Sequence, residues 1–536
     1  MVMIKVADRT IPWGTMSDLV EAKAEEHGNA IFAEIAGQSL TYAELERQSR
    51  AVAENLVARG IVKGDRVGTL LFNSIEQVLM CFGCARAGAI WVPINAALRG
   101  EDLTYTIRDS GIVLLVTEDE CLVEFVRLAA AVKAQVEVFV VGNAPAPYRA
   151  FAELLEARDG IVLPQCAPSD TGAILYTGGT TGLPKGVLLS QFSFILGGLR
   201  YRDVFDAQRG ERHFSVLPLF HAGALHWALM GPLVSDMSTV IDRRFSANSY
   251  FERVRECRAN IIDPFGAVVT LLCHQPPSPL DTKHGVRISV GVVQNLPDGI
   301  PEQFEKRFQI PMISVYGLTE AGGNITSNRL PDRVPNSNGR AHGWAEIRIA
   351  DDDDLPLPAG EVGEILLRPT YPHMFGQGYH NAPEQSLKAI RNLWLHTGDL
   401  GYLDDNENLY YLGRQAHWIR RRGENISAYE IESAMAKHPH IDEVVVVGVR
   451  SEIGEDDVKA FIIPASGATI DFVELVGWTA ERLAAFKVPR FIELVDDFPR
   501  SATKQEIERS KLKAMSNARA WDREKILGRI SGQARG

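Results

Sequence analysis

The chain has 536 residues, of which 46% are hydrophobic and 23% are charged, and its formal net charge is −12. A chain of this length exceeds a single hydrophobic core, so we expect two or more domains, and its composition is ordinary for a globular protein. The negative charge argues against nucleic acid or an anionic membrane as the main partner, and no apolar run approaches the roughly 20 residues of a membrane span. The N-terminal residues lack the basic-then-apolar pattern of a secretory signal, so we expect a cytoplasmic protein.

The first part of the chain alternates predicted helices and strands. Thr41, followed three residues later by Glu44, forms a capping box, which predicts the start of a helix. Apolar patterning predicts strands at residues 67–72, 89–93 and 111–117, separated by helices at 76–86 and 103–108. This alternation predicts a parallel sheet that is covered by helices on both faces.

Six cysteines are too few for a disulfide scaffold in a chain of this length. Cys81 and Cys84 form a CxxC motif, which is compatible with a redox or metal site. However, no second Cys/His pair follows, and the surrounding residues are mostly apolar. We therefore expect buried free cysteines on a helix face.

A stretch rich in glycine and threonine follows a predicted strand at residues 173–176. It reads Tyr-Thr-Gly-Gly-Thr-Thr-Gly-Leu-Pro-Lys-Gly from Tyr176 to Gly186. Glycines allow the backbone to approach a ligand closely, hydroxyls and backbone N–H groups donate to anionic oxygens, and Lys185 adds positive charge. Pro184 before the lysine distinguishes the stretch from the common P-loop. The pattern therefore predicts a phosphate-binding loop of another class rather than a plain surface turn.

Two further motifs follow downstream. Ser314-Val-Tyr-Gly-Leu-Thr-Glu320 reads as a strand that ends in polar residues, and Trp394-Leu-His-Thr-Gly-Asp399 ends in a carboxylate. A carboxylate such as that of Glu320 suits Mg²⁺, which is a hard cation, and the two oxygens of Asp399 suit a diol. Together with the glycine-rich loop, these motifs resemble those of the adenylate-forming superfamily, which includes acyl-CoA synthetases, peptide-synthetase adenylation domains and firefly luciferase.

The resemblance extends along nearly the whole chain and implies a two-domain α/β fold. It implies a large N-terminal AMP-binding domain of stacked α/β sheets at residues 1–412. A small, mobile α+β C-terminal domain would occupy residues 413–536, with a hinge near 414–417. In this last part, apolar patterning predicts a helix at 431–437 and strands at 444–449 and 459–463.

The resemblance also implies roles in a nucleotide site. Tyr316 would stack on adenine, Asp399 would accept hydrogen bonds from both ribose hydroxyls, and Arg414 would contact ribose and phosphate. Thr319 would bond a phosphate oxygen, and Mg²⁺ would be held by two residues, Thr177 and Glu320. The ATP- and AMP-binding residues implied in this way are Thr177, Gly178, Gly179, Thr180, Thr181, Gly182, Lys185, Tyr316, Gly317, Thr319, Asp399 and Arg414.

A further motif, Leu217-Pro-Leu-Phe-His-Ala-Gly223, matches the superfamily pattern in which a Phe–His pair borders the acyl pocket and the histidine gates it. On its chemistry alone, a histidine at this place could also be an ordinary loop residue. The resemblance favours the functional interpretation. The acyl-pocket residues implied are Phe220, His221, Gly223, Phe265, Gly291 and Asn295.

Three positions depart from the superfamily pattern. Gly178 stands where serine is usual, and Ala416 stands at the hinge, where aspartate or lysine is usual. The lysine that bridges the carboxylate substrate and the α-phosphate falls on Gln505 without a gap, with Lys504 one place earlier. The catalytic residues implied are Lys185, His221, Glu320 and Lys504. The residues implied for CoA binding and the hinge are Ala416, Gly423, Glu424 and Lys487.

The motifs predict an ATP-dependent acyl-CoA synthetase that activates a carboxylic acid as acyl-AMP and transfers it to CoA, with ATP, Mg²⁺ and CoA as its cofactors. The run Gly423–Ser427 resembles the carnitine/crotonobetaine and fatty-acid CoA ligase branch. The departures motivate an alternative, an enzyme of one half-reaction. It would perform either adenylation, with a carrier protein in trans as an acceptor, or thioester formation from a supplied acyl-adenylate. A third alternative is a non-catalytic protein that binds a nucleotide or an acyl-adenylate.

Overall fold

The computed structural model describes residues 4–6, 9–134, 136–177, 183–291, 296, 299–351, 353–414, 418–421, 424–451, 454–499, 507 and 509–528. The chain divides into two compact units. The large unit comprises residues 1–96, 107–176 and 186–413, and the small unit comprises residues 97–106, 177–185 and 414–536. The predicted mixed α/β class, with a large N-terminal part and a smaller C-terminal part, is confirmed. The hinge at 414–417 stays a prediction, because residues 415–417 lie outside the described part.

The first sheet of the large unit has seven strands in the order β11-β10-β6-β5-β7-β8-β9. The pairings from β10 through β6, β5, β7 and β8 to β9 are parallel, so the parallel sheet predicted for this region is confirmed. The strands are β5 (Arg66–Leu70), β6 (Ile90–Pro93), β7 (Leu114–Glu118), β8 (Glu137–Val141), β9 (Arg149–Ala150), β10 (Thr171–Thr177) and β11 (Lys185–Ser190).

Helices α2 (Tyr42–Ala58) and α3 (Ile75–Ala87) pack against each other in this region. The predicted capping box begins α2: the Thr41 hydroxyl accepts from the Glu44 N–H, and the Glu44 carboxylate accepts from the Thr41 N–H. Helix α3 is buried along its whole length, and Cys81 and Cys84 are buried free thiols, as expected. Burial raises the pKa of both thiols, so they remain protonated and unreactive.

The second sheet has eight strands in the order β17-β16-β15-β14-β12-β13-β3-β4. Neighbouring strands from β16 to β3 are parallel, whereas β17 and β4 are antiparallel edges. The carboxyl ends of β12, β14, β15 and β16 therefore meet at one edge, where ligands bind in open α/β sheets. The strands are β3 (Ile31–Ile35), β4 (Gln38–Thr41), β12 (Arg212–Ser215), β13 (Ser238–Ile241), β14 (Ile261–Ile262), β15 (Ile288–Gly291), β16 (Met312–Leu318) and β17 (Gly323–Ser327).

A third, antiparallel sheet follows with the order β18-β19-β21-β20, and β22 also pairs with β21. It brings the Trp394–Asp399 motif into the large unit on a ten-residue strand. The strands are β18 (Ala345–Ala350), β19 (Gly363–Pro369), β20 (Ile390–Arg391), β21 (Trp394–Leu403) and β22 (Leu409–Arg414).

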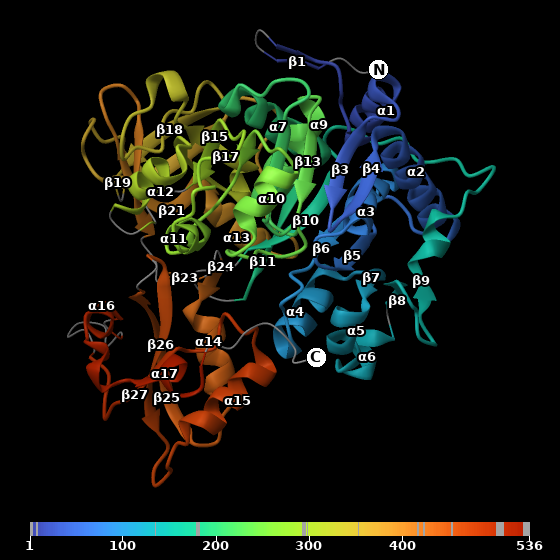
Figure 1. Ribbon diagram of the computed structural model, residues 1–536. Helices are drawn as coiled ribbons and strands as arrows, with labels where there is room; N and C mark the ends of the chain where they lie inside the picture. The colour runs from blue at the N-terminus through green and yellow to red at the C-terminus, as the bar shows by residue number, and fades with distance from the viewer. Residues whose placement is uncertain are drawn as a thin grey trace. The chain divides into compact units, whose positions relative to one another are not determined.

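Helix α7 (Gln191–Phe205) follows β11 and is buried on nearly all sides, which is typical of a helix inside a core. It packs against α9 (Gly231–Val234), as Figure 1 shows. The other helices are α1 (Met16–His27), α4 (Gly100–Ser110), α5 (Asp119–Val126), α6 (Ala130–Lys133), α8 (Ala222–Ala224), α10 (Tyr250–Glu256), α11 (Ala267–Cys273), α12 (Ile300–Phe308) and α13 (Pro383–Ala389), and a short hairpin joins β1 (Ile4–Val6) to β2 (Arg9–Ile11).

The small unit holds a four-stranded sheet in the order β25-β26-β27-β28. It also holds a two-stranded ribbon of β23 and β24 (Figure 1). Its helices and strands mix as predicted for an α+β part. They are β23 (Trp418–Arg421), β24 (Glu424–Ser427), α14 (Ala428–Met435), β25 (Ile441–Arg450), β26 (Asp456–Pro464), α15 (Phe472–Arg482), β27 (Phe491–Leu494), α16 (Arg509–Lys513), β28 (Trp521–Asp522) and α17 (Arg523–Ile526). Across the described residues of the whole chain, every helix is too short or too polar to cross a bilayer.

Candidate active site

The candidate site is built around β16, which carries Tyr316 and Gly317 and leads into a 3-10 turn that bears Thr319 and Glu320. Strand β17 folds back against it, with a register shift between Tyr316 and Gly317. Glycine is required at 317, because a Cβ there would lie 2.3 Å from a carbonyl oxygen and 2.4 Å from a Cα of β17. This close approach of the two backbones holds the polar turn at the carboxyl end of β16.

Tyr316 joins this turn to the third sheet. Its hydroxyl donates to Oδ2 of Asp399 on β21 over 2.8 Å, and the Asp399 N–H donates to the hydroxyl of Thr397 over 3.0 Å. Both partners are buried, with 6% of Tyr316 and 3% of Asp399 exposed. Burial, and then the negative charge of Asp399, raise the pKa of the Tyr316 phenol well above its ordinary value. The phenol therefore stays protonated and orients the carboxylate. The adenine contact of Tyr316 and the ribose contact of Asp399 stay predictions.

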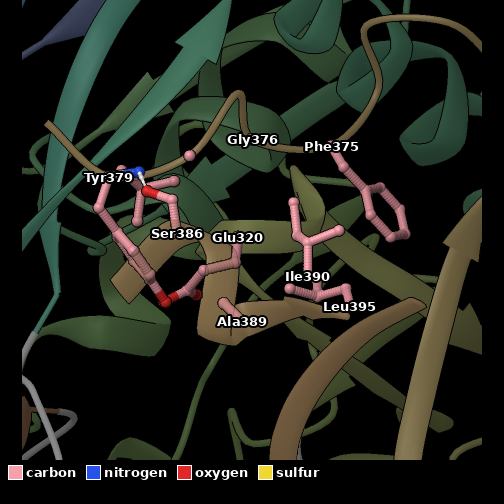
Figure 2. Close-up of a pocket in the computed structure, with 10 residues that line it drawn as sticks. Glu320, Phe375, Gly376, Tyr379, Ser386, Ala389, Ile390 and Leu395 are labelled. Carbon is pink, nitrogen blue, oxygen red and sulfur yellow. Dashed lines mark hydrogen bonds between the residues drawn. The ribbon is translucent and has the colours of Figure 1, made fainter. Parts of the chain in front are cut away.

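Glu320 is half-buried and meets a second tyrosine. The Tyr379 hydroxyl donates to Oε1 of Glu320 over 2.9 Å (Figure 2). Tyr379 could not be predicted as a partner of Glu320 from the sequence, because 59 residues separate the two and no local pattern links them. The available signal was modest: Tyr379 ends the run Gly376-Gln-Gly-Tyr and precedes a helix with proline in its first turn.

The predicted acyl-pocket residues follow the ends of neighbouring parallel strands in the second sheet. Phe220 and His221 lie after β12, with ring centroids 4.6 Å apart, and both are half-buried. Phe265 lies after β14 and packs edge-on against Trp227 at 5.8 Å. A Cβ placed on Gly223 would meet nothing within 4 Å, so there is open space beside His221.

Gly291 ends β15, where a Cβ would lie 3.0 Å from the Met312 sulfur. Asn295 lies outside the described residues. The fold thus brings Phe220, His221, Phe265 and Gly291 to one edge of one sheet, although their role as an acyl pocket stays a prediction.

The glycine-rich stretch lies between β10 and β11 in the sequence; the strand before it was predicted, whereas the strand after it was not. Gly178, Gly179, Thr180, Thr181 and Gly182 lie outside the described residues. At its two ends, the Thr177 hydroxyl donates to the Lys185 carbonyl over 3.5 Å, and Lys185 is half-buried.

The strand before this loop is anchored in the large unit. The hydroxyl of Tyr176 on β10 donates to the Asp109 carboxylate over 2.6 Å, and Asp109 lies on α4. This contact fixes the strand end from which the loop begins.

The predicted CoA and hinge residues are described only in part. Ala416, Gly423 and Lys504 lie outside the described residues. Arg414 ends β22 and Glu424 begins β24, and only their backbones are described.

Lys487, predicted to contribute to CoA binding, lies in a buried ionic cluster of the small unit. Its Nζ is 2.6 Å from the Glu430 carboxylate and 3.0 Å from that of Asp102, and 5% of its side chain is exposed. Burial lowers the pKa of Lys487, but the two carboxylates outweigh burial and leave it raised. Burial also raises the pKa of Glu430 and of Asp102, against the attraction of Lys487. These ion pairs indicate a structural role for Lys487, and its role in CoA binding stays a prediction.

A buried histidine packs against the hairpin of β16 and β17. His226 lies in a π-helical segment, Leu225–Met230, and a Cβ placed on Gly197 or Gly323 would lie 2.4 Å from its ring. Within the described residues, neither ring nitrogen has a hydrogen-bond partner. Burial, and then the charge of Arg200, lower the pKa of His226 to about 3, so the ring is neutral. The burial of this histidine could not be predicted from the sequence, because the two glycines that pack against its ring lie on other elements.

Comparison with known families gives two matches along the chain. The family described as AMP-binding enzyme matches residues 20–380, and the family described as AMP-binding enzyme C-terminal domain matches residues 430–505. The crotonobetaine/carnitine-CoA ligase of Salmonella heidelberg (strain SL476) is 32% identical over 483 residues, which cover 88% of this chain and 93% of the relative.

Solved structures agree with these matches. ATP-bound MatB from Rhodopseudomonas palustris is 27% identical, with a TM-score of 0.67 over 93% of this chain and 98% of that chain. A double mutant of the o-succinylbenzoate CoA synthetase from Bacillus subtilis shares the fold at 24% identity, with a TM-score of 0.80 over 93% of this chain and 98% of that chain. Because the first family match alone spans more than half of its residues, the chain belongs to the AMP-binding enzyme family, the adenylate-forming superfamily that its motifs resemble.

Proposed function

We propose that the protein is an ATP-dependent acyl-CoA synthetase, which activates a carboxylic acid as an acyl-adenylate and then transfers the acyl group to CoA. The observation that carries the proposal is the 2.8 Å hydrogen bond between Tyr316 and Asp399, which fixes a buried carboxylate beside the strand end that bears Glu320. Membership of the AMP-binding enzyme family and similarity to named CoA ligases support it.

The first half-reaction has an electrostatic problem to solve. A carboxylate is a poor electrophile, so it attacks the α-phosphorus of ATP, and pyrophosphate leaves. Two anions must approach each other, and negative charge grows on the phosphate oxygens in the transition state. The site must therefore supply positive charge and hydrogen-bond donors at fixed positions. We assign the β- and γ-phosphates to Lys185 and to the loop from Thr177 to Gly182.

The nucleoside is assigned to residues on β16, β21 and β22. A carboxylate has two acceptor oxygens, so Asp399 suits the two ribose hydroxyls. Tyr316 would face adenine, with Gly317 allowing the close backbone approach, and Thr319 would bond a phosphate oxygen. Arg414 would contact ribose and phosphate.

Magnesium is the cation that the proposed donor set suits. Glu320 contributes a carboxylate that is already oriented by a neutral phenol, and Thr177 contributes a hydroxyl, and both are oxygen donors of the kind that Mg²⁺ prefers. When bound, the ion would neutralise part of the phosphate charge. We therefore assign Glu320 and Thr177 to hold it.

The second half-reaction delivers a thiol to the acyl-adenylate. We assign the acyl pocket to Phe220, His221, Gly223, Phe265, Gly291 and Asn295, with His221 at its entry. Lys504 would orient the carboxylate substrate during adenylation, which is a positioning effect. The CoA side is assigned to Ala416, Gly423, Glu424 and Lys487. Water must be excluded between the two steps, because the adenylate hydrolyses.

Two observations suggest which carboxylic acids to test as substrates: the name of a relative and the open space at Gly223. The relative from Salmonella heidelberg is named as a crotonobetaine/carnitine-CoA ligase, so both acids should be included in the first test. A Cβ placed on Gly223 would meet nothing within 4 Å, and we assign the acyl chain to this open space near His221. Fatty acids of increasing length would test how far that room extends.

One set of observations favours a second candidate, an enzyme of a single half-reaction. Ala416 replaces the polar residue expected at the hinge, and Gln505 occupies the expected lysine position, with Lys504 one place earlier. An enzyme that cannot orient the carboxylate would lose adenylation but could still transfer a supplied acyl group to CoA. An enzyme that adenylates without CoA transfer would need another acceptor, such as a carrier protein in trans.

The test follows the two half-reactions separately. Purified protein receives ATP, Mg²⁺ and a panel of carboxylic acids, with and without CoA, and pyrophosphate and acyl-CoA are measured independently. Synthetic acyl-adenylates with CoA are run in parallel. We expect both products from at least one acid, and Asp399→Asn should abolish most of the pyrophosphate release while leaving the fold intact.

The other outcomes separate the alternatives. Acyl-CoA that forms only from a supplied adenylate would indicate a thioesterification enzyme. Pyrophosphate without acyl-CoA would indicate adenylation alone. Binding of ATP without any product, over the whole panel, would contradict the proposed function and favour a non-catalytic nucleotide-binding protein.

A further inference from the structure

A pocket opens beside Glu320 in the large unit. Figure 2 shows the side chains of Glu320 and Tyr379 meeting on the side of the pocket away from Phe375. The remaining walls are mostly apolar, formed chiefly by Val187, Phe375, Ile390 and Leu395. In these surroundings the phenol of Tyr379 is the polar group that the Glu320 carboxylate meets, and their oxygens are 2.9 Å apart.

The main chain of Tyr379 is itself held in place. Its N–H donates to the Ser386 hydroxyl over 2.8 Å (Figure 2). That hydroxyl donates in turn to the Ala382 carbonyl over 2.9 Å. Ser386 lies on α13, so the helix fixes the backbone from which the tyrosine ring extends.

The segment that carries Tyr379 also bonds to the strand that leaves the glycine-rich loop. The Gln377 N–H donates to the Leu188 carbonyl over 2.8 Å, and the His380 N–H donates to the Gly186 carbonyl over 2.7 Å, both on β11. On its other side, the Gly376 N–H donates to the Glu320 carbonyl over 2.8 Å. One short segment therefore fixes both the backbone and the carboxylate of Glu320 relative to β11.

The nature of the donor decides what the contact can do. An arginine or lysine in place of Tyr379 would orient the Glu320 carboxylate but would also cancel its charge. A phenol donates one hydrogen bond and carries no charge, so the carboxylate keeps its full negative charge for a cation. Mutation of a group that holds a metal-binding side chain in this way typically lowers metal affinity or activity about 10- to 100-fold.

We propose that Tyr379 is a positioning residue, which holds the Glu320 carboxylate in the orientation needed to bind the divalent cation that accompanies ATP. The inference rests on the proposed function, because it assumes that Glu320 binds that cation. Tyr379 does not touch the nucleotide in this proposal, and it acts only through Glu320.

The test measures ATP binding rather than turnover. Isothermal titration calorimetry gives the Kd for ATP with MgCl₂ and with EDTA, in the full-length wild type, Tyr379→Phe, Glu320→Gln and the double variant. We expect Mg²⁺ to tighten ATP binding in the wild type, and Tyr379→Phe to reduce that gain about 10- to 100-fold. In the Glu320→Gln background, Tyr379→Phe should leave the remaining Mg²⁺-dependent gain unchanged, since the charge that the phenol positions for the cation is gone.

A matched variant controls for loss of a phenol as such. Tyr410→Phe removes a hydroxyl that lies 3.5 Å from the Asp404 carboxylate, away from Glu320, and should leave the Mg²⁺-dependent gain unchanged. Equal gains in wild type and Tyr379→Phe would overturn the inference while leaving the proposed function standing. An equal loss from Tyr379→Phe in both Glu320 backgrounds would also overturn it, in favour of a general structural role. A wild type that binds ATP no better with Mg²⁺ than with EDTA would overturn both proposals.

Discussion

Carboxylates away from the surface are held in two different ways in the two units. In the large unit, Asp399 and Glu320 accept hydrogen bonds from the phenols of Tyr316 and Tyr379, over 2.8 and 2.9 Å. In the small unit, the carboxylates of Glu430 and Asp102 share one cation, the ammonium group of Lys487. A phenol orients a carboxylate without cancelling its charge, whereas an ammonium group does both.

We therefore expect the phenol-held acids to act in binding and the cation-held acids to stabilise the fold. A phenol carries no charge, so this contact by itself does not cancel the carboxylate's charge toward an incoming cation or hydroxyl, and it partly offsets the cost of desolvation. A charge that is paired inside the protein already has its counter-charge. Removal of one partner leaves the other charge buried and uncompensated. The comparison therefore predicts that changes among the phenol-held acids alter binding more than stability. Changes in the ionic cluster should alter stability more than binding.

The largest effect should come from breaking the ionic cluster. Lys487→Met removes the cation that contacts both Glu430 and Asp102, and it should lower the free energy of unfolding by about 3–5 kcal/mol. Urea denaturation of the full-length protein measures this change. Unchanged stability with a raised KM for CoA would contradict the structural role and favour the CoA role of Lys487.

A surface pair provides the control for that variant. Lys63 lies 2.6 Å from the Asp170 carboxylate, but 43% of its side chain is exposed. Water already solvates both partners there, so Lys63→Met should change the free energy of unfolding by less than about 1 kcal/mol.

His226 is a buried base of a third kind. Among the described residues, neither of its ring nitrogens has a hydrogen-bond partner. Its pKa of about 3 lies below the ordinary 6.5, so the unfolded state binds its proton first as the pH falls. The contribution of neutral His226 to the free energy of unfolding is complete above about pH 6.5, and it is lost as the pH falls toward about 3. Between about pH 7 and pH 4.5 this group alone should cost about 2–3 kcal/mol of stability.

The measurement compares two proteins at two pH values. His226→Leu has a side chain of similar volume that cannot take up a proton. The urea stability of the wild type should therefore fall more steeply between about pH 7 and pH 4.5 than that of the variant, by the amount just given. Parallel slopes would show that His226 is not the group that titrates.

Asp399→Asn tests the other side of the comparison. The amide oxygen can still accept the hydrogen bond from Tyr316, so stability should change by less than about 1 kcal/mol. The loss of charge should weaken MgATP binding about 10- to 100-fold, because hydrogen bonds to a charged acceptor are stronger. Calorimetry of ATP binding measures the loss. A variant that lost stability but kept its ATP affinity would show that Asp399 stabilises the fold rather than binding the nucleotide.

Local features of the fold could be predicted from the sequence, because short-range physics determines them. The Thr41–Glu44 capping box, the buried Cys81 and Cys84 and the parallel sheet of the first third all follow from neighbouring residues. The strand that ends before Glu320 was also predicted, and β16 ends at Leu318.

The partners of the candidate site could not be predicted in the same way. Tyr316 and Asp399 are 83 residues apart and lie on different sheets, and Lys487 and Asp102 are 385 residues apart. Contacts of this kind depend on how sheets and helices pack, and no periodicity along the chain encodes that packing. Motif resemblance located Glu320 and Asp399, but it did not show that phenols hold both of them.

The smallest effect should come from Tyr316→Phe, which keeps the aromatic ring and removes the hydroxyl that holds Asp399. We expect MgATP binding to weaken about 3- to 10-fold, the size of one lost hydrogen bond, since any contact of the ring with adenine is retained. The matched control is Tyr42→Phe, whose buried hydroxyl donates to the Met237 carbonyl over 2.8 Å and which should lower stability without changing ATP affinity. If both variants left ATP affinity unchanged, the phenol would not orient Asp399 for binding. The contrast between phenol-held and cation-held acids would then describe the packing of the two units rather than their function.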